Sequence, residues 1–127
     1  MKHPEYLLQC SVCAYLKLQF PTVLFLSDTI ANIRLTIGQS MRNKKIQKED
    51  FKTPDLLILQ PNKNYHGLFI ELKVKSPYKK DGTLLKDEHL EGQLKTIKAL
   101  RRLGYMADFA VGFDQARAMI DAYMKDV

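Results

Sequence analysis

Two short apolar segments with a turn between them constrain the fold of this chain more than any other feature. The first, residues 54–60, contains four apolar residues in a row, and the second, residues 68–75, begins with three. Unbroken apolar runs of this length are typical of strands buried on both faces. The intervening residues 61–64, Pro-Asn-Lys-Asn, favour a turn. The sequence therefore predicts an antiparallel hairpin inside a sheet.

Helical patterns surround this hairpin. Apolar periodicity predicts helices over residues 4–18, 31–48 and 87–103 and from 114 onward, with further strands at 23–26 and 105–111. Gly104 is expected to end the third helix, and Asp114 to cap the fourth. In the second helix, Ile33, Ile37 and Met41 are expected along one face. The order α-β-α-β-β-α-β-α predicts an α/β fold with a central mixed sheet flanked by helices.

Length and charge narrow the class of partner. The chain has 127 residues, which we expect to form one domain. Its net charge of +6 suits a polyanion such as nucleic acid. No apolar run approaches the roughly 18 residues of a membrane span, and the N-terminus lacks the layout of a signal peptide, so we expect a cytoplasmic protein. Cys10 and Cys13 lie inside a helical pattern and are expected to be reduced and partly buried.

The end of the second hairpin strand carries an alternating set of charges. Glu71, Lys73 and Lys75 share one face because strand side chains alternate. One interpretation is that this end of the strand emerges into solvent. The first strand supports another, since Asp55 opens it and the hairpin brings Asp55 near Glu71. Two carboxylates at the edge of a core repel each other, and Mg²⁺ would remove that repulsion with the Leu72 carbonyl as a further oxygen ligand.

The spacing of these residues resembles a known nuclease signature. Pro54-Asp55, fifteen residues, then Glu71-Leu72-Lys73 is similar to the PD-(D/E)XK motif. Over residues 5–124 the chain resembles the virus-type replication-repair nuclease (VRR-NUC) domain in its stand-alone phage and prophage form. Further matching positions are Glu5, Gln9, Tyr65-His66-Gly67-Leu68-Phe69-Ile70, Gln93, Leu103-Gly104-Tyr105 and Val111-Gly112-Phe113-Asp114. Thr53 departs from the glycine that family members commonly carry there.

The resemblance implies a restriction-endonuclease-like fold and metal-dependent hydrolysis of DNA, in a bacterial or phage-infected cell. Asp55 and Glu71 would hold Mg²⁺ or Mn²⁺ with the Leu72 carbonyl. Lys73 would either act as a base or stabilise the phosphate electrostatically. Gln93 would hydrogen-bond the metal-bound water or the substrate. Glu5 is either a further ligand or outer group, or part of a solvated first turn.

The family likeness also implies a class of DNA. A small domain offers little surface for reading base sequence, so we expect selection by shape among junctions, flaps and nicks. Two symmetric cuts at a four-way junction favour a twofold homodimer, with an apolar patch on the first or second helix as its interface. The rival hypothesis is a basic nucleic-acid-binding module that keeps the fold without catalysis.

Several side chains have weaker claims. Lys75, Lys79 and Lys80, with Lys86, either grip phosphates from a loop or are merely solvated. Arg34 and Arg42 are secondary candidates for contacts with the DNA backbone. We assign His66 and His89 turn and surface roles. Gly92 is unusual inside a helix. It either permits a close approach by backbone or substrate or is simply tolerated.

Overall fold

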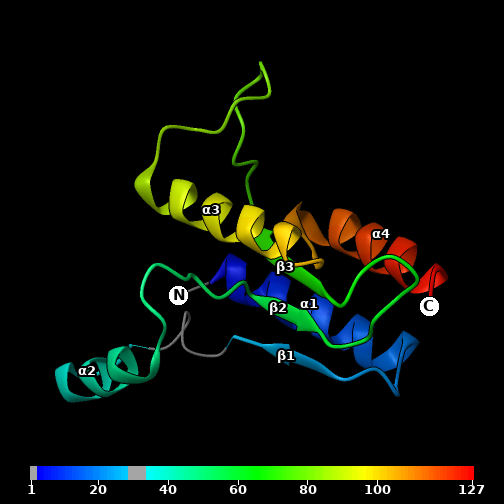
Figure 1. Cartoon of the computed structure of the whole chain (residues 1–127), viewed down its shortest axis with the longest axis horizontal. Helices are drawn as coiled ribbons and strands as arrows, with labels where there is room; N and C mark the ends of the chain where they lie inside the picture. Colours follow the sequence, from blue (N-terminus) through cyan, green and yellow to red (C-terminus); the bar gives the residue numbers. More distant parts are fainter. Residues whose placement is uncertain (1–2, 29–33) are drawn as a thin grey trace.

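The computed structural model describes residues 3–28 and 34–127 and has the predicted order of elements (Figure 1). The elements are α1 Pro4–Gln19, β1 Phe25–Ser27, α2 Ile37–Ile46, β2 Leu56–Ile58, β3 Leu68–Lys73, α3 Glu88–Arg102, β4 Met106–Val111 and α4 Gly112–Lys125. The predicted α/β class with a mixed sheet is confirmed.

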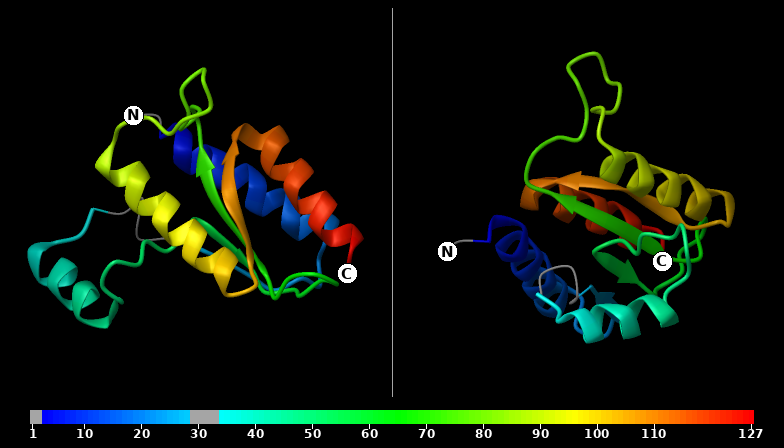
Figure 2. Two further views of the ribbon diagram at one scale, coloured as in Figure 1. Left: turned by 45° about the horizontal axis from the view of Figure 1, so that its top comes forward. Right: turned by 90° about the vertical axis from the view of Figure 1, so that its left-hand side faces the viewer.

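The sheet has the strand order β1-β2-β3-β4. The β2–β3 pair is the predicted antiparallel hairpin, with Leu56 opposite Ile70. The β1–β2 pair is also antiparallel, whereas β3 and β4 run parallel. Figure 2 shows α3 on one face of the sheet and α1 and α4 on the other. The sheet is therefore open, with β1 and β4 as its edges.

Successive residues of β3 pack into two different cores, one on each face. Ile70 belongs to a cluster with Leu16 of α1 and Ile120 of α4. Phe69 belongs to a second cluster with Ile97 of α3. Because side chains alternate along a strand, Glu71 must share the Phe69 face and point toward α3. Glu71 is only 6% exposed, so the interpretation of a solvated face is wrong for Glu71, whereas Lys75 further along is exposed.

The third helix has the predicted ends. Asp87 is its N-cap, and its carboxylate accepts a hydrogen bond from the Leu90 N–H at 3.0 Å. At the other end Gly104 has a φ of +93°. The N–H groups of Gly104 and Tyr105 donate to the carbonyls of Arg101 and Leu100, each at 3.1 Å. This double closure is the Schellman motif, which favours glycine at its left-handed position.

The second helix is shorter than predicted. It begins at Ile37 rather than near residue 31, because the Thr36 hydroxyl accepts from the Gln39 N–H and the Gln39 side chain accepts from the Thr36 N–H. Its apolar side chains do not face a core: Ile37 is 83% exposed and Met41 is 59% exposed. Both side chains are therefore exposed apolar groups on this helix. Ile33 lies outside the described residues.

The N-cap of the fourth helix lies three residues earlier than predicted. Val111 is its N-cap, and the Val111 N–H donates to the Gln115 side chain at 2.8 Å. Asp114 therefore lies in the first turn, where a negative charge complements the helix dipole, and is not the cap. Gly112 supplies the tight strand-to-helix connection with a φ of +77°.

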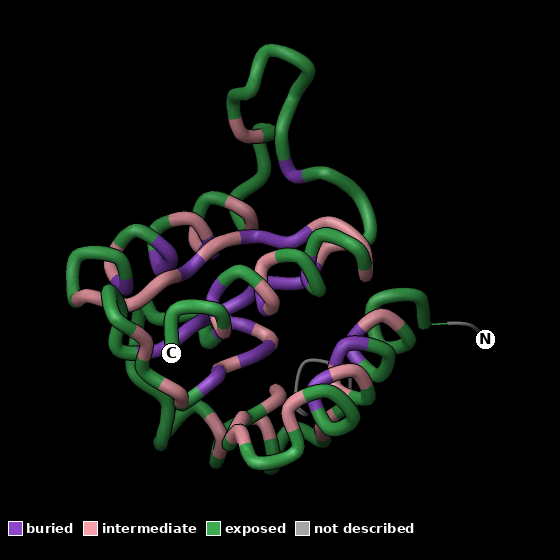
Figure 3. The backbone as a smooth tube through the Cα atoms, turned by 90° about the vertical axis from the view of Figure 1, so that its right-hand side faces the viewer, coloured by how far each residue is buried: buried purple, intermediate pink, exposed green. Residues whose placement is uncertain are grey.

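The segment between β3 and α3 projects from the body as an exposed loop (Figures 1 and 3). Its base is fixed by buried Pro77 and by the Tyr78 ring, which packs edge-on against Phe109 with centroids 6.0 Å apart. A bridge between Tyr78 and Leu84 closes the loop. Lys79 and Lys80 lie on this loop and are exposed.

Two other sequence expectations concern the cysteines and the absence of a membrane-spanning segment. Both cysteines are free thiols, as expected, but the expectation of partial burial holds only for half-buried Cys13 and is wrong for Cys10, which is exposed. Over residues 3–28 and 34–127, no helix combines the length and the apolar character that a bilayer crossing requires.

Candidate active site

The register of the hairpin brings the two predicted carboxylates together. Leu56 pairs with Ile70, so one step further along Asp55 lies opposite Glu71. Directly opposite residues of an antiparallel pair have their side chains on the same face. The Asp55 carboxylate also accepts a hydrogen bond of 2.7 Å from the Leu72 N–H. The sequence prediction for the positions of Asp55, Glu71 and Leu72 is therefore confirmed, while a metal-binding role for them stays a prediction.

The two carboxyl groups share a proton. Burial, followed by the charge of Asp55 and their mutual hydrogen bond, raises the pKa of Glu71 to about 9. Burial also raises the pKa of Asp55, while hydrogen bonds from Glu71 and from the Leu72 N–H act in the opposite direction. We conclude that at neutral pH Glu71 carries the proton and donates it to Asp55. Glu71 would release this proton if a cation replaced it.

Gln93 contacts this pair from α3, while its hydrogen bond to a metal-bound water or the substrate stays a prediction. Its Nε2 donates to Glu71 Oε1 at 3.0 Å and lies 3.1 Å from His89 Nε2. Its Oε1 is buried and has no hydrogen-bond partner among the described residues. A buried amide oxygen that accepts no hydrogen bond lowers the stability of the fold, because it has lost its contact with water. It is suited to accept a hydrogen bond from a water or ligand beside Glu71.

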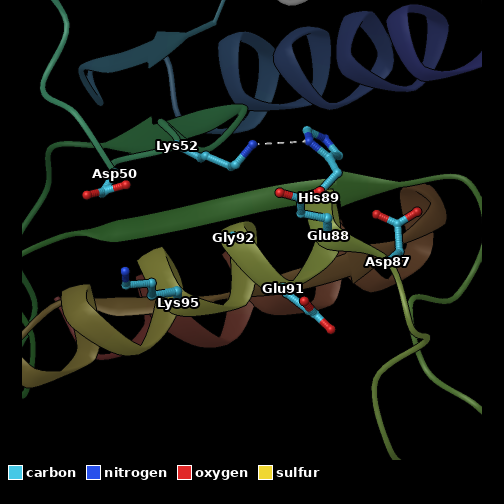
Figure 4. A pocket seen from close by; sticks show the side chains of 8 residues that line it. All are labelled: Asp50, Lys52, Asp87, Glu88, His89, Glu91, Gly92 and Lys95. Carbon is cyan, nitrogen blue, oxygen red and sulfur yellow. Dashed lines mark hydrogen bonds between the residues drawn. The ribbon is translucent and has the colours of Figure 1, made fainter.

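His89 is exposed, as its assigned surface role requires, but it also lines the cavity, which the sequence analysis missed. It precedes Gln93 by one helical turn, and residues at this spacing share a helix face. Its other ring nitrogen, Nδ1, lies 3.4 Å from Lys52 Nζ (Figure 4). The sequence contains that spacing, but it does not show that this face of α3 meets Glu71. His66, by contrast, has the expected turn role and packs against Tyr105.

Lys52 crosses α3 at Gly92. The Lys52 N–H donates to Thr96 Oγ1 at 3.1 Å, which holds this segment against the helix. A Cβ on Gly92 would lie 2.5 Å from Lys52 Cε. Figure 4 shows the Lys52 side chain reaching toward His89, while Glu91 points away from both. The glycine therefore permits a close approach by a side chain of the same chain.

Lys73 extends from the same face of β3 as Glu71. Its ammonium lies 5.8 Å from the centroid of the Phe109 ring, a cation–π contact. Its charge lowers the pKa of both Asp55 and Glu71, against the larger effect of burial. The site thus has the ammonium of Lys73 beside a half-buried and a buried carboxyl group, Asp55 and Glu71.

A third carboxylate, Asp28, completes a row across three strands and was missed by the sequence analysis. Ser27 pairs with Leu56, so Asp28 lies opposite Asp55, and the Asp28 N–H donates to the Asp55 carbonyl at 2.9 Å. Asp28 raises the pKa of both Asp55 and Glu71. The sequence shows only that a carboxylate follows an apolar strand directly. It does not show that β1 pairs with β2, which is what brings Asp28 to Asp55.

The first helix reaches the same edge of the sheet. Buried Gln9 donates through Nε2 to Ser27 Oγ at 2.5 Å and to the Asp28 carbonyl at 2.8 Å. Gln9 therefore fixes the end of β1, a positioning role that agrees with its place in the sequence resemblance. Glu5, one turn earlier, is exposed and lines the same cavity as Asp28 and Asp55. A role for Glu5 as a metal ligand stays a prediction.

These side chains open into a cavity of about 750 Å³. Its acidic part is lined by Glu5, Asp28, Asp55, Glu71, Lys73, His89 and Gln93, and the rest by Leu26, Ser27, Asn43, Gln47, Phe51, Lys52, Thr53, Pro54, Leu57 and Leu72. Thr53, the departure from the family pattern, is exposed and lies in the wall before Asp55. The volume lies within the roughly 300–1,000 Å³ typical of ligand sites.

The predicted DNA-contacting residues lie further out. Lys75, beyond the end of β3, lines an adjoining groove with Tyr6 and Lys73. Within the part of the chain that the structure describes, the cavity lining does not include Lys79, Lys80, Arg34 or Arg42. All four are exposed. Their contact with DNA stays a prediction.

The donor set fits a hard divalent cation. Among residues 3–28 and 34–127, no group of three or more His, Cys, Asp or Glu side chains is placed to hold a metal ion. Mg²⁺ needs no such cage, since it usually takes one or two carboxylates and keeps waters and substrate phosphates as its other ligands. Asp55 and Glu71 would supply these two carboxylates. The buried Oε1 of Gln93, which has no partner among the described residues, could accept a hydrogen bond from a water bound to the ion.

Comparison with known proteins supports the fold. No family model and no curated protein matches the chain. A solved structure described as a VRR_NUC domain protein superposes with a TM-score of 0.61, over 99% of this chain and 92% of the other, at 22% sequence identity. The predicted resemblance to a VRR-NUC domain is therefore confirmed at the level of the fold.

Proposed function

We propose that the protein is a metal-dependent nuclease that hydrolyses DNA phosphodiester bonds. The observation that carries this proposal is the juxtaposition of half-buried Asp55 and buried Glu71 across the β2–β3 pair, beside Lys73 and Gln93 at an open cavity. Neither structural stability nor simple DNA binding requires two carboxyl groups in contact at the edge of a core, since their burial is unfavourable. Catalysis explains the arrangement.

Each side chain has a role that follows from its position. Asp55 and Glu71 would hold Mg²⁺ or Mn²⁺, with the Leu72 carbonyl as a further oxygen. The bound ion would lower the pKa of water and neutralise charge on the phosphate. Lys73, on the Glu71 face, would place its ammonium against a phosphate oxygen or the attacking water. Gln93 orients Glu71 and offers its free Oε1 to a water in the cavity.

DNA as the substrate is supported by charge and by shape. The net charge of +6 favours a polyanion. Lys75, Lys79 and Lys80 lie on or beside the projecting loop, where they would contact phosphates away from the reacting bond. Such contacts position a duplex without reading its sequence, so selection of branched or interrupted DNA is proposed. A homodimer, which suits paired cuts, stays a prediction to be tested by sedimentation.

The test is cleavage of end-labelled four-way junction, flap and linear duplex DNA with Mg²⁺, Mn²⁺ or EDTA. Asp55→Asn and Lys73→Ala should abolish cutting. Their matched controls, Asp114→Asn and Lys98→Ala, replace exposed residues outside the cavity and should cut normally. Binding without cutting of any substrate, unchanged in the Asp55 and Lys73 variants, would favour the non-catalytic binding module instead.

A further inference from the structure

One half of the cavity has no acidic groups and serves no evident purpose in hydrolysis. Leu26 of β1, Leu57 of β2 and Phe51 before β2 make it apolar, and Asn43 and Gln47 add amide groups. Leu26 is 61% exposed and Phe51 is 37% exposed. Large apolar side chains gathered in a hollow, with a few polar groups at its rim, are typical of a binding site.

This apolar half is a continuation of the catalytic face of the sheet. Leu26 pairs with Leu57, so both side chains point to the same side. Leu57 follows Asp55 by two residues and therefore shares its face. Asp55 and Leu57 lie roughly 7 Å apart along the strand. A nucleotide whose phosphate lies at Asp55 could therefore place its own base at Leu57.

Neither flanking helix closes the hollow. The α3 helix packs over β3 and β4 through Ile97 and Leu100, with Leu57 at the margin of that cluster. On the other side stands α2, which makes no extended contact with any helix or strand in the described part of the chain. It presents Asn43 and Gln47 to the cavity. Its last turn carries Lys44 and Lys45, which are exposed.

We propose that this half of the cavity binds an unstacked nucleobase of the strand being cut. Phe51, Leu26 and Leu57 supply apolar surface for the base, and Phe51 supplies an aromatic ring for stacking. Asn43 and Gln47 each offer both donors and acceptors, which matches the mixed edge of a base. The neighbouring lysines of α2 complement the flanking phosphates, a charge pattern that suits a nucleic-acid strand better than an apolar peptide.

The inference rests on the proposed function for the position of the phosphate, and it narrows the substrate. A base can enter the hollow only after leaving its stack, which costs least where the nucleotide is already unpaired. The preferred substrate is therefore DNA with an unpaired nucleotide next to the cleaved bond, as in a flap or a branch point. A continuous, fully paired duplex is disfavoured.

The first test measures binding alone, in EDTA, so that it does not depend on cleavage. One DNA carries 2-aminopurine in a single-stranded arm at its junction with a duplex, and a second carries it in a fully paired duplex of the same length. Wild-type protein should bind the armed DNA about 10-fold more tightly and change the fluorescence of its 2-aminopurine. A factor of this size corresponds to one base–aromatic stack.

Matched variants locate the effect. Phe51→Ala should lose about 10-fold in affinity for the armed DNA and little for the paired DNA, and Phe51→Trp should keep the preference. Tyr65→Ala is the control, since Tyr65 is 41% exposed and lies at the opposite end of the hairpin. In the second pair, Leu26→Ser should weaken the preference, whereas Leu24→Ser should not. Leu24 is 72% exposed and is outside the cavity lining.

The outcomes separate this inference from the proposed function. Equal binding of both DNAs by the wild-type protein, or equal loss on both in Phe51→Ala and Leu26→Ser, would overturn the base site. Cutting of paired duplex with Mg²⁺ as fast as armed DNA would overturn it too, with the nuclease intact. Selective binding that depends on Phe51, without any cutting, would support the base site and overturn the proposed nuclease.

Discussion

The two regions that border the cavity, β3 and α2, are stabilised in opposite ways. Five of the six β3 residues are buried, and its side chains pack into the cores on both faces of the sheet. None of the ten α2 residues, all of which the structure describes, is buried, and the helix depends on its own capping box. Tertiary packing therefore fixes the carboxylate pair, while local hydrogen bonds maintain the helix that faces it.

This difference suggests that β3 positions the reacting groups, whereas α2 adjusts to the ligand. Reacting groups must be held within a fraction of an ångström, and only a packed strand does that. A helix outside the core can adjust to a ligand at little cost, because elements with few buried contacts open at low free energy. We therefore expect β3 variants to affect chemistry and global stability, and α2 variants to affect binding and local order.

The largest effect that the comparison predicts is on cleavage by a β3 variant. Glu71→Gln keeps the shape of the side chain but cannot ionise, so it should lower the cutting rate roughly a thousandfold, the equivalent of about 4 kcal/mol of transition-state stabilisation. Folding should be unimpaired, because the variant removes an acid that burial disfavours. The matched control is Glu91→Gln on the exposed side of α3. A Glu71→Gln protein that cuts normally would contradict the assigned role.

The same residue predicts how stability changes with pH. Because the pKa of Glu71 is raised to about 9, the folded metal-free protein keeps a proton that the unfolded chain releases near pH 4.5. Stability should therefore be highest near pH 5 and fall toward pH 9, by up to about 1.4 kcal/mol per pH unit. Urea denaturation in EDTA across this range measures it. Glu71→Gln should flatten the slope, and an equally steep slope in that variant would place the titrating group elsewhere.

The fold was predictable wherever a local signal decided it. The Pro-Asn-Lys-Asn turn and the apolar runs set the hairpin, and the hairpin register alone brings Asp55 to Glu71. The third helix was predicted to within a residue because Asp87 is a local start signal and Gly104 a local stop signal. The start of α2 was equally local, in the Thr36–Gln39 capping box, but helical periodicity continued past it and obscured it.

The parts of the site that were missed depend on contacts between distant segments. Asp28 matters because β1 pairs with β2, and nothing within β1 specifies its neighbour. His89 matters because the Gln93 face of α3 contacts Glu71 on the side of the sheet that α3 covers. A single sequence gives the spacing of His89 and Gln93 but not the side from which α3 covers the strand. Burial of Glu71 likewise followed from the helix packed above it rather than from its own alternation.

Removing the N-cap of α3 or of α2 tests, with a smaller expected effect, whether packing or local hydrogen bonds stabilise each helix. Asp87→Ala should lower the global free energy of unfolding by about 1 kcal/mol, because α3 is packed into the sheet core. Thr36→Ala removes a comparable cap but should lower the global free energy of unfolding by only a few tenths of a kcal/mol, because α2 buries no residue. Amide hydrogen exchange should show lost protection confined to α2. Equal global losses in both variants would mean that α2 is coupled to the core.

The smallest effects are expected on the projecting loop, which shares its exposure with α2 but lies outside the cavity. If Lys79 and Lys80 contact phosphates, Lys79→Ala and Lys80→Ala should each weaken DNA binding only a few-fold, and equally for armed and paired DNA. Each should also reduce the slope of log affinity against log salt by about 1. Lys98→Ala on α3 is the matched control. An unchanged salt slope would show that the loop lysines are simply solvated, and a loss confined to armed DNA would mean that the loop, rather than α2, senses the unpaired strand.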